Sequence, residues 1–438
     1  MSLISTIQER IAISLPANSL RERFALGAFW SIVGTVISQA LALLASIITA
    51  RILGKSIFGE LGMIVSTVGM FGVFAGLGLG LTATKYIAEF RSKDPERTGR
   101  IIGLSSIVAL LSGSVIALVL FGCAPYLAEH TLKSAHLTIG LQIGCILLFF
   151  NALNGAQTGA LAGFEAFKTI AKINLIRGLL TFPVLIAGVY FWDLNGAIAG
   201  QALAAAIGWF LNHLALRSES RRNNIHPTYR LLSQEFSVLW KFSLPALFSG
   251  ALVGPVTWIA NTMLIRQPNG YGELGIFNAA NQWRTALMFF PGILSQTIMP
   301  MLSNTLGLGQ NNSARKLLKT TISISFIELL PPAIIIALIS PIIMAQYGEG
   351  FREGWPVLIC CIATAMLLGI QQPVGNLIAA SGKMWIGFFM NSGWAIVFII
   401  CVYAFIKLGA LGMALAFIIS YFVHGIWTIS YGYLKIIK

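Results

Sequence analysis

The chain has 438 residues, of which 56% are hydrophobic and only 10% are charged, and its mean hydropathy is +0.81. Soluble domains average about 25% charged residues, so this composition excludes a soluble globular protein and predicts a polytopic helical membrane protein. The formal charge of +14 does not indicate nucleic-acid binding, because no soluble domain offers a basic face, and cytoplasmic loops rich in Lys and Arg explain it better.

Apolar stretches of about 20 residues predict an all-α membrane protein with about twelve transmembrane helices. The predicted spans run over residues 24–49, 58–84, 101–123, 137–159, 173–191, 195–215, 241–265, 274–303, 318–345, 355–380, 385–406 and 408–433. With the N-terminus inside, 20 of the 29 Lys and Arg residues fall in cytoplasmic segments and 6 fall on the opposite side. Both termini are therefore predicted to be cytoplasmic.

Residues 1–23 mix charged residues with short apolar pieces. Because no uninterrupted apolar core precedes a cleavage site, we expect a short cytoplasmic segment rather than a signal peptide. The five cysteines lie in apolar runs, and their spacing matches no zinc or haem motif. We therefore expect no metal and no cofactor.

The second predicted span carries a row of glycines on one face: Gly69, Gly72, Gly76 and Gly80. Small residues in such a row let two helix backbones approach closely in a membrane, so this face is predicted to pack against a neighbouring helix. Lys85 follows at the end of the span, four residues before Glu89. It either forms a surface pair with Glu89 or guards the entrance to a transport path.

Polar amides gather in the fourth and tenth predicted spans: Asn151, Asn154 and Gln157, and Gln371, Gln372 and Asn376. They either bridge helices by hydrogen bonds or contact a solute, and both interpretations are open. Arg177 lies near the start of the fifth span. We favour a position in the lumen for it, because Lys168 and Lys172 already supply the charge of the preceding loop.

The stretch 277–291 contains an arginine and several polar neighbours within an apolar run: Asn278, Asn281, Gln282, Arg284 and Thr285. A cation at membrane depth costs about 2.5–3.5 kcal/mol on insertion scales, so such residues tend to face a bundle interior or a water-filled cavity. We favour a cationic strip that lines a transport path. The alternative is an arginine that snorkels to the nearer headgroups. Pro291 is predicted to break the helix.

Glu328 is the deepest carboxylate in the sequence, and it precedes Pro331 and Pro332 in the ninth predicted span. A carboxylate at this depth beside a helix break suggests a proton or cation site. It could equally be a structural partner of Arg284, and both interpretations are open.

Three short motifs recur in the same order at nearly one offset: residues 58–63 with 271–276, 194–197 with 408–411, and Gly163 with Gly382. They indicate that six helices were duplicated in parallel, which predicts a pseudo-twofold axis along the membrane normal and a site between two lobes. The predicted parts are a cytoplasmic segment (1–23), a first lobe (24–216), a basic cytoplasmic linker (217–240) and a second lobe (241–438).

These residues resemble the polysaccharide-transporter branch of the multidrug/oligosaccharidyl-lipid/polysaccharide superfamily, the Wzx-type O-antigen flippases. The resemblance rests on residues 50–62, 76–80 and 82–89. Residues 281–284, with Pro291 and Pro300, are also similar to the eighth helix of that family.

The resemblance implies a MATE-like architecture of two pseudo-symmetric six-helix lobes around a central cavity. It also implies that undecaprenyl-diphosphate-linked oligosaccharide, an O-antigen or exopolysaccharide repeat unit, is moved outward across the bacterial inner membrane by alternating access, driven by a cation gradient. Here the lumen charge would come from Arg284 and, more weakly, from Lys85 and Arg177, with the amides beside Arg284. The coupling residue does not transfer by motif, so Glu328 is our own hypothesis. The expected partners are the lipid-linked oligosaccharide, membrane lipids, and a polysaccharide polymerase with other assembly proteins.

Two alternatives come from different classes of protein. A multidrug exporter of the same superfamily would typically keep acidic residues in its lobes, whereas the embedded charges here are mostly positive and favour an anionic substrate. A membrane glycosyltransferase or polymerase would need paired carboxylates, or a carboxylate with a histidine, at its outer face. The outer loops offer no such compact motif. We therefore predict a transporter and not an enzyme.

Overall fold

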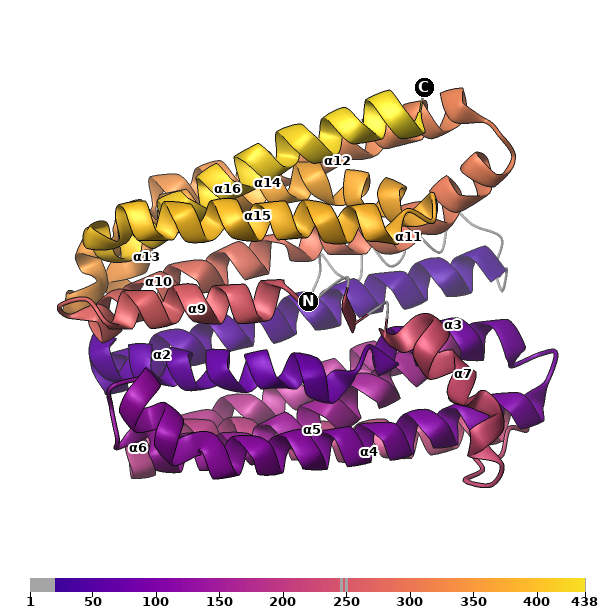
Figure 1. The fold of residues 1–438 in the computed structure, drawn as a ribbon, viewed down its shortest axis with the longest axis horizontal. Helices are drawn as coiled ribbons and strands as arrows, with labels where there is room; N and C mark the ends of the chain where they lie inside the picture. Colours follow the sequence, from indigo (N-terminus) through magenta and orange to yellow (C-terminus); the bar gives the residue numbers. More distant parts are fainter. Residues whose placement is uncertain (1–19, 245–246, 249–250, 438) are drawn as a thin grey trace.

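The computed structural model describes residues 20–244, 247–248 and 251–437, and within these ranges every regular element is a helix. Figure 1 shows the helices in two stacked layers. The first layer holds α2 (Leu20–Gly76), α3 (Leu79–Phe90), α4 (Pro95–Tyr126), α5 (Leu137–Gly163) and α6 (Phe167–Arg222). The second layer holds α9 (Val253–Ile265), α10 (Gly270–Leu287), α11 (Phe289–Gly307), α12 (Asn311–Leu338), α13 (Ser340–Gln346), α14 (Trp355–Ala380), α15 (Met384–Phe405) and α16 (Gly409–Tyr431). Residues 1–19 of the predicted segment 1–23 lie outside the described residues.

Seven helical segments of the described chain are long and apolar enough to cross a membrane. Three of them are 52 to 56 residues long: Val36–Phe90, Phe167–Arg222 and Trp385–Ile436. One crossing needs about 20 residues, so each of the three is long enough for two. Large apolar side chains point outward from the seven segments, as on Leu118, which is 71% exposed. The helical membrane fold is confirmed, and the number of twelve spans stays a prediction.

Two long helices bend between predicted spans. α2 bends at Gly54 (φ 74°), between the predicted spans 24–49 and 58–84. α6 bends at Trp192 and Asp193 (φ 45°), between the predicted spans 173–191 and 195–215. Glycine adopts a positive φ without a steric penalty, whereas Asp193 combines its positive φ with a ψ of −128° at a kink inside α6. Each bend therefore falls where the sequence predicts a turn between two crossings.

The second predicted span, 58–84, is not one continuous helix as predicted. α2 ends at Gly76 and α3 begins at Leu79. Leu77 (φ 43°) and Gly78 (φ 67°) between them lie in the left-handed region, where a helix of L-residues cannot continue. The apolar run hides this break, because its hydropathy does not change across it.

The prolines also act differently from the prediction. The break near Pro291 falls earlier, at Met288 between α10 and α11. Proline lacks the N–H that would bond the carbonyl four residues before it, here that of Leu287. Pro331 and Pro332, in contrast, lie inside α12, which continues to Leu338. The prediction that Glu328 lies beside a helix break is therefore wrong.

The two copies of the repeated motif face each other where the layers cross. The missing side chain of Gly59 leaves room for the carbonyl oxygen of Tyr271, and that of Gly275 leaves room for the carbonyl oxygen of Lys55. Any Cβ at either glycine would overlap the facing backbone. These glycines let α2 and α10 approach closely, as small residues do in membrane helices.

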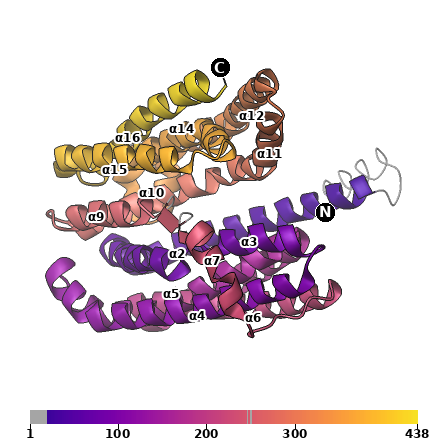
Figure 2. The ribbon, with the colours of Figure 1, turned by 45° about the vertical axis from the view of Figure 1, so that its right-hand side comes forward.

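Several hydrogen bonds join the layers near the end where α2 bends. The Tyr271 hydroxyl donates to the carbonyl oxygen of Leu132 at 2.8 Å, and the Arg51 guanidinium donates to Gln346. Burial raises the pKa of Tyr271, which precedes the predicted span 274–303, to about 12, so this donor keeps its proton at neutral pH. In Figure 2, α10 lies against α2, whereas α12 and α3 stand apart.

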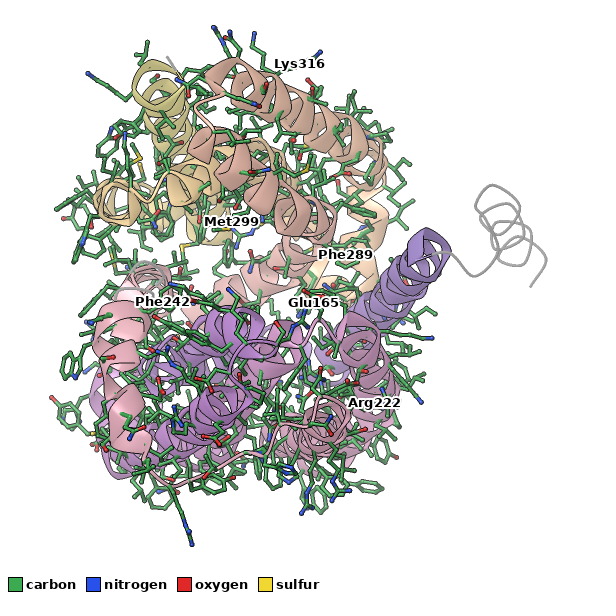
Figure 3. All side chains as sticks on the ribbon, turned by 90° about the vertical axis from the view of Figure 1, so that its right-hand side faces the viewer. Glu165, Arg222, Phe242, Phe289, Met299 and Lys316 are labelled. Atoms are coloured by element: carbon green, nitrogen blue, oxygen red, sulfur yellow. The ribbon has the colours of Figure 1, made fainter. Side chains whose placement is uncertain are left out.

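The loops predicted to be cytoplasmic share the opposite end, which faces the viewer in Figure 3 with Glu165, Arg222 and Lys316 labelled. Here the chain after α6 packs back onto the first layer. The Glu235 carboxylate, 3% exposed, pairs with Arg97 at 3.1 Å and with Arg100 at 3.3 Å. Within the predicted linker 217–240, residues near Glu235 are therefore fixed to α4. The division into lobes and the side of the membrane stay predictions.

Candidate functional site

The first layer contains a cavity of about 650 Å³. We call it the first-layer cavity; both arms of α2, α5 and both arms of α6 line it. Its polar lining residues are Ser38, Gln39, Asn151, Asn174, Arg177, Thr181 and Gln201. Small-molecule sites measure about 300–1,000 Å³, so the first-layer cavity is large enough for a ligand.

Arg177 is the charged residue among those that line this cavity. Its side chain passes over Gly208, where a Cβ would lie 3.0 Å from the arginine Cδ. Neither the ion pairs nor the hydrogen bonds of the described residues include its guanidinium. An uncompensated cation in a lobe of a membrane protein attracts an anionic group. The arrangement agrees with the predicted position of Arg177 in a lumen, although its role stays a prediction.

The two open interpretations, a hydrogen bond between helices and contact with a solute, apply to different amides of the fourth predicted span. The Asn154 amide donates to the carbonyl oxygen of Ala205 at 2.9 Å and accepts from Asn212 at 2.9 Å, so it bridges α5 and α6. Asn151, one turn away, lines the first-layer cavity instead. One face of α5 therefore combines a structural hydrogen bond with a polar group that is free to meet a solute.

The glycine row of the second predicted span packs against a helix only at its end. A Cβ on Gly80 would lie 3.0 Å from the carbonyl oxygen of Gly155. Gly69, Gly72 and Gly76 have no atom within 4 Å of the corresponding position, and they line the first-layer cavity. The prediction of tight packing is wrong for these three. The sequence signal that could have shown this lies in the partner helix. α5 carries Gly155 and Gly159 opposite Gly80, and it carries larger residues further along.

Arg284 lies in the second layer, half-buried on α10. Its Cζ atom is 4.8 Å from the centre of the Phe417 ring of α16, a cation–π distance. Gln282, beside it, is also half-buried. The Asn281 Oδ1 atom is buried without a hydrogen-bond partner.

The residues of the predicted polar strip around Arg284 lie in two different environments. The side-chain amide of Asn278 fills the space left by Gly62 of α2, so it lies where the layers cross and not beside Arg284 on a lumen wall. Thr285 is exposed, and its hydroxyl donates to the Asn281 carbonyl oxygen at 3.1 Å. Helical periodicity places these residues on one face, but the crossing of α2 over α10 covers part of it.

Lys85 lies near the end of the first layer that is predicted to be cytoplasmic. Its Nζ atom is 4.3 Å from the centre of the Phe242 ring and 5.0 Å from that of Tyr86. The ion pairs of the described residues do not include Lys85 with Glu89, so the predicted surface pair is not formed. These aromatic contacts hold the exposed Lys85 ammonium at the end of the first layer that is predicted to be cytoplasmic.

Glu328 is half-buried on α12, and its Oε1 atom is buried without a hydrogen-bond partner. The ion pairs of the described chain do not include Glu328 with Arg284. Pro331 and Pro332 also deprive the carbonyls of Ile327 and Glu328 of their usual helical donors. Unpartnered oxygens of this kind suit a proton or a hard cation.

Comparison with known proteins gives one consistent result. Residues 24–306 match the family described as "Polysaccharide biosynthesis protein". The chain is similar to the "EPS I polysaccharide export inner membrane protein EpsE" of Ralstonia nicotianae, with 23% identity over 391 residues that cover 87% of each chain. It is also similar to the "Lipid III flippase" of Escherichia coli, with 22% identity over 283 residues that cover 64% of this chain and 67% of the flippase.

Among solved structures, an inward-facing multidrug resistance MATE family transporter of the MOP superfamily matches with a TM-score of 0.72 and 17% identity. The match covers 93% of this chain and 98% of the transporter. At this identity it shows the fold alone. The predicted MATE-like architecture is therefore confirmed at the level of the fold.

Proposed function

Since the chain belongs to the polysaccharide biosynthesis protein family, within the superfamily of polysaccharide and multidrug transporters, we propose that it moves a lipid-linked oligosaccharide across the bacterial inner membrane. The specific substrate that we propose is undecaprenyl-diphosphate-linked oligosaccharide, the repeat unit of an O-antigen or exopolysaccharide. A relative of the same size is named for polysaccharide export and for the inner membrane, and another is named a lipid III flippase.

The observation that supports the proposal best is the unpaired Arg177 in a cavity whose lining, within the described part of the chain, includes no Asp or Glu. Arg284 adds a second embedded cation in the other layer, held over Phe417. A guanidinium binds phosphate or carboxylate oxygens with two parallel hydrogen bonds. Two cations at membrane depth, one in each layer, suit an anionic lipid-linked sugar, which needs positive charge along its path.

We propose that transport alternates between a form closed at the predicted outer end and one open there. The close contact of Gly59 and Gly275 with the facing backbones supports closure at that end. Lys85 at the other end would meet the diphosphate first. Arg284 would then hold it with the amides of Asn281 and Gln282, and opening of the outer end would release it.

We also propose that a cation gradient drives the cycle through Glu328. The unpartnered Oε1 atom of this carboxylate supports the proposal. A proton or a sodium ion on Glu328 would remove or balance a buried charge, and this could favour one arrangement of α12 over the other. Among partners, we expect a polysaccharide polymerase that consumes the exported unit.

A multidrug exporter is the alternative within the same fold. Organic cations are the usual substrates of such exporters, and a cavity whose lining carries an arginine and, among the described residues, no carboxylate would repel them. A glycosyltransferase or polymerase is a weaker alternative, because the relatives are named for export and flipping.

The test is complementation in cells that lack their own O-antigen flippase. Expression of this chain should restore surface polysaccharide, and Arg177→Ala at equal membrane abundance should restore much less. Resistance to cationic drugs serves as the control measurement. No surface polysaccharide from wild-type protein, in any of several hosts with different repeat units, would contradict the proposal. A gain in drug resistance instead would support the exporter.

A further inference from the structure

The charge of the first-layer cavity limits what it can bind. Among the residues that the structure describes, its lining supplies one cation, Arg177, and no carboxylate. A diphosphate carries two or more negative charges and is balanced best by more than one cation, whereas one guanidinium matches one carboxylate in a bidentate pair. The charge of this cavity therefore favours a monoanionic group over the diphosphate.

The rest of the polar lining suits hydroxyl groups. Gln39, Asn151, Asn174 and Gln201 line the cavity. Each primary amide offers two donor hydrogens and one acceptor oxygen. Sugar hydroxyls both donate and accept, so an amide-rich wall can satisfy several of them at once. Phe182, also in the lining, offers an apolar face to the C–H side of a ring.

Bare backbone forms another wall of the cavity. We define the glycine wall as Gly69, Gly72 and Gly76 of α2 with Gly155 of α5, all of which line the cavity and face open space. From Gly69 to Gly76 the helix rises about 10 Å. Glycine inside a helix costs about 0.5–1 kcal/mol relative to alanine, and here no helix–helix contact offsets that cost. We therefore attribute the presence of glycine at these positions to the open space that it leaves in the cavity.

From the charge, the amides and the space together, we propose that the first-layer cavity binds one sugar unit of the transported oligosaccharide and that this unit carries a carboxylate. Arg177 pairs with the carboxylate, the amides bind the ring hydroxyls, and the ring lies on the glycine wall. The inference rests on the proposed function, and it adds the class of substrate: an acidic oligosaccharide, as in chains that contain a uronic acid.

The experiment measures binding of soluble probes to the purified full-length chain in detergent, by saturation-transfer NMR. The probes are methyl glucuronide, methyl glucoside and pyrophosphate. We expect methyl glucuronide to bind at least tenfold more tightly than methyl glucoside, and pyrophosphate to bind no more tightly than methyl glucuronide. Arg177→Gln, which keeps hydrogen-bond donors but removes the charge, should abolish the preference for the acid.

The second part of the experiment adds a bulky side chain to the glycine wall. Gly72→Leu should weaken both sugars at least tenfold, while Gly122→Leu should change neither. Gly122 is the matched control, because it also faces open space in a membrane helix but does not line the cavity. Gly72→Ala adds only one methyl group to the open space. Comparison of its thermal midpoint with that of Gly72→Leu detects a folding defect in the leucine variant.

Several results would overturn the inference. They are no binding of either sugar, equal binding of both sugars to the wild type, a preference that survives Arg177→Gln, or tighter binding of pyrophosphate, which would assign the cavity to the diphosphate. None of these binding measurements requires transport. Failure of complementation with intact glucuronide binding would instead contradict the flippase proposal, so the two failures are distinguishable.

Discussion

Arg284 illustrates how one embedded cation can be tested against two roles. Its guanidinium lies over the Phe417 ring, and such a contact contributes about 0.5–2 kcal/mol. If Arg284 also grips a diphosphate, Arg284→Ala should abolish export, and Arg284→Lys should retain part of it, since an ammonium binds as a point charge. Arg284→Glu should be worse than Arg284→Ala, because a like charge repels the substrate.

Export for these variants is measured at equal membrane abundance, so that a folding defect is seen separately. Thr285→Ala is the matched control, because Thr285 is the exposed neighbour on the same helix. Equal export from the wild type, Arg284→Lys and Arg284→Ala would mean that the arginine only snorkels to headgroups.

Glu328 allows a test of coupling. Because its Oε1 atom has no partner in the described structure, removing the charge should not leave another group unpaired, and Glu328→Gln should fold. We expect this variant to lose the response of transport to a proton or sodium gradient. Flux into vesicles is measured with and without each gradient, and Glu349→Gln, which changes an exposed carboxylate at the start of a short 3-10 helix, is the control. An unchanged gradient response would leave Glu328 with a structural role.

The sequence identifies which residues are unusual, but it does not identify what they face. A charge inside an apolar run is visible without a structure, and this is why Arg177, Arg284 and Glu328 could be selected. The surroundings of Asn278 could not be predicted, because they depend on Gly62, which is distant in the chain and meets it only where two helices cross.

The crossing of α2 and α10 can be tested as a unit. Gly275→Leu places a side chain where the backbone of Lys55 lies, so the two helices must separate and the outer end should no longer close. A single cysteine at Asn278, in a background without the five native cysteines, should then react faster with an impermeant maleimide added from outside. Gly387→Leu is the control, since a Cβ there meets no atom within 4 Å. An unchanged labelling rate would show that this contact does not seal the outer end.

Helices were easier to predict than their ends. Hydropathy places the long apolar runs, because the bilayer requires about 20 apolar residues for each crossing. It does not detect the break at Leu77 and Gly78, where polarity is constant and only the backbone angles change. Nor does it separate a glycine that packs, such as Gly80, from one that opens a cavity, such as Gly72, because the difference lies in the partner helix.

At the scale of the whole molecule, the fold arranges two layers that touch at one end and place the basic loops at the other. The structure shares its fold with a transporter of the MOP superfamily. The side of the membrane on which each end lies stays a prediction from the distribution of charge.

Topology can be measured with single cysteines placed on exposed residues at the two ends of the molecule. Asn223 and Asn312 lie at the end with the basic loops, and Lys133 and Glu349 lie at the other end; all four are exposed. If basic loops stay in the cytoplasm, an impermeant maleimide added to intact spheroplasts should label cysteine at 133 and 349 and should leave 223 and 312 unlabelled until the cells are opened. Labelling of 223 and 349 from the same side would contradict the two-ended arrangement, whereas complete reversal would invert the protein and direct transport inward.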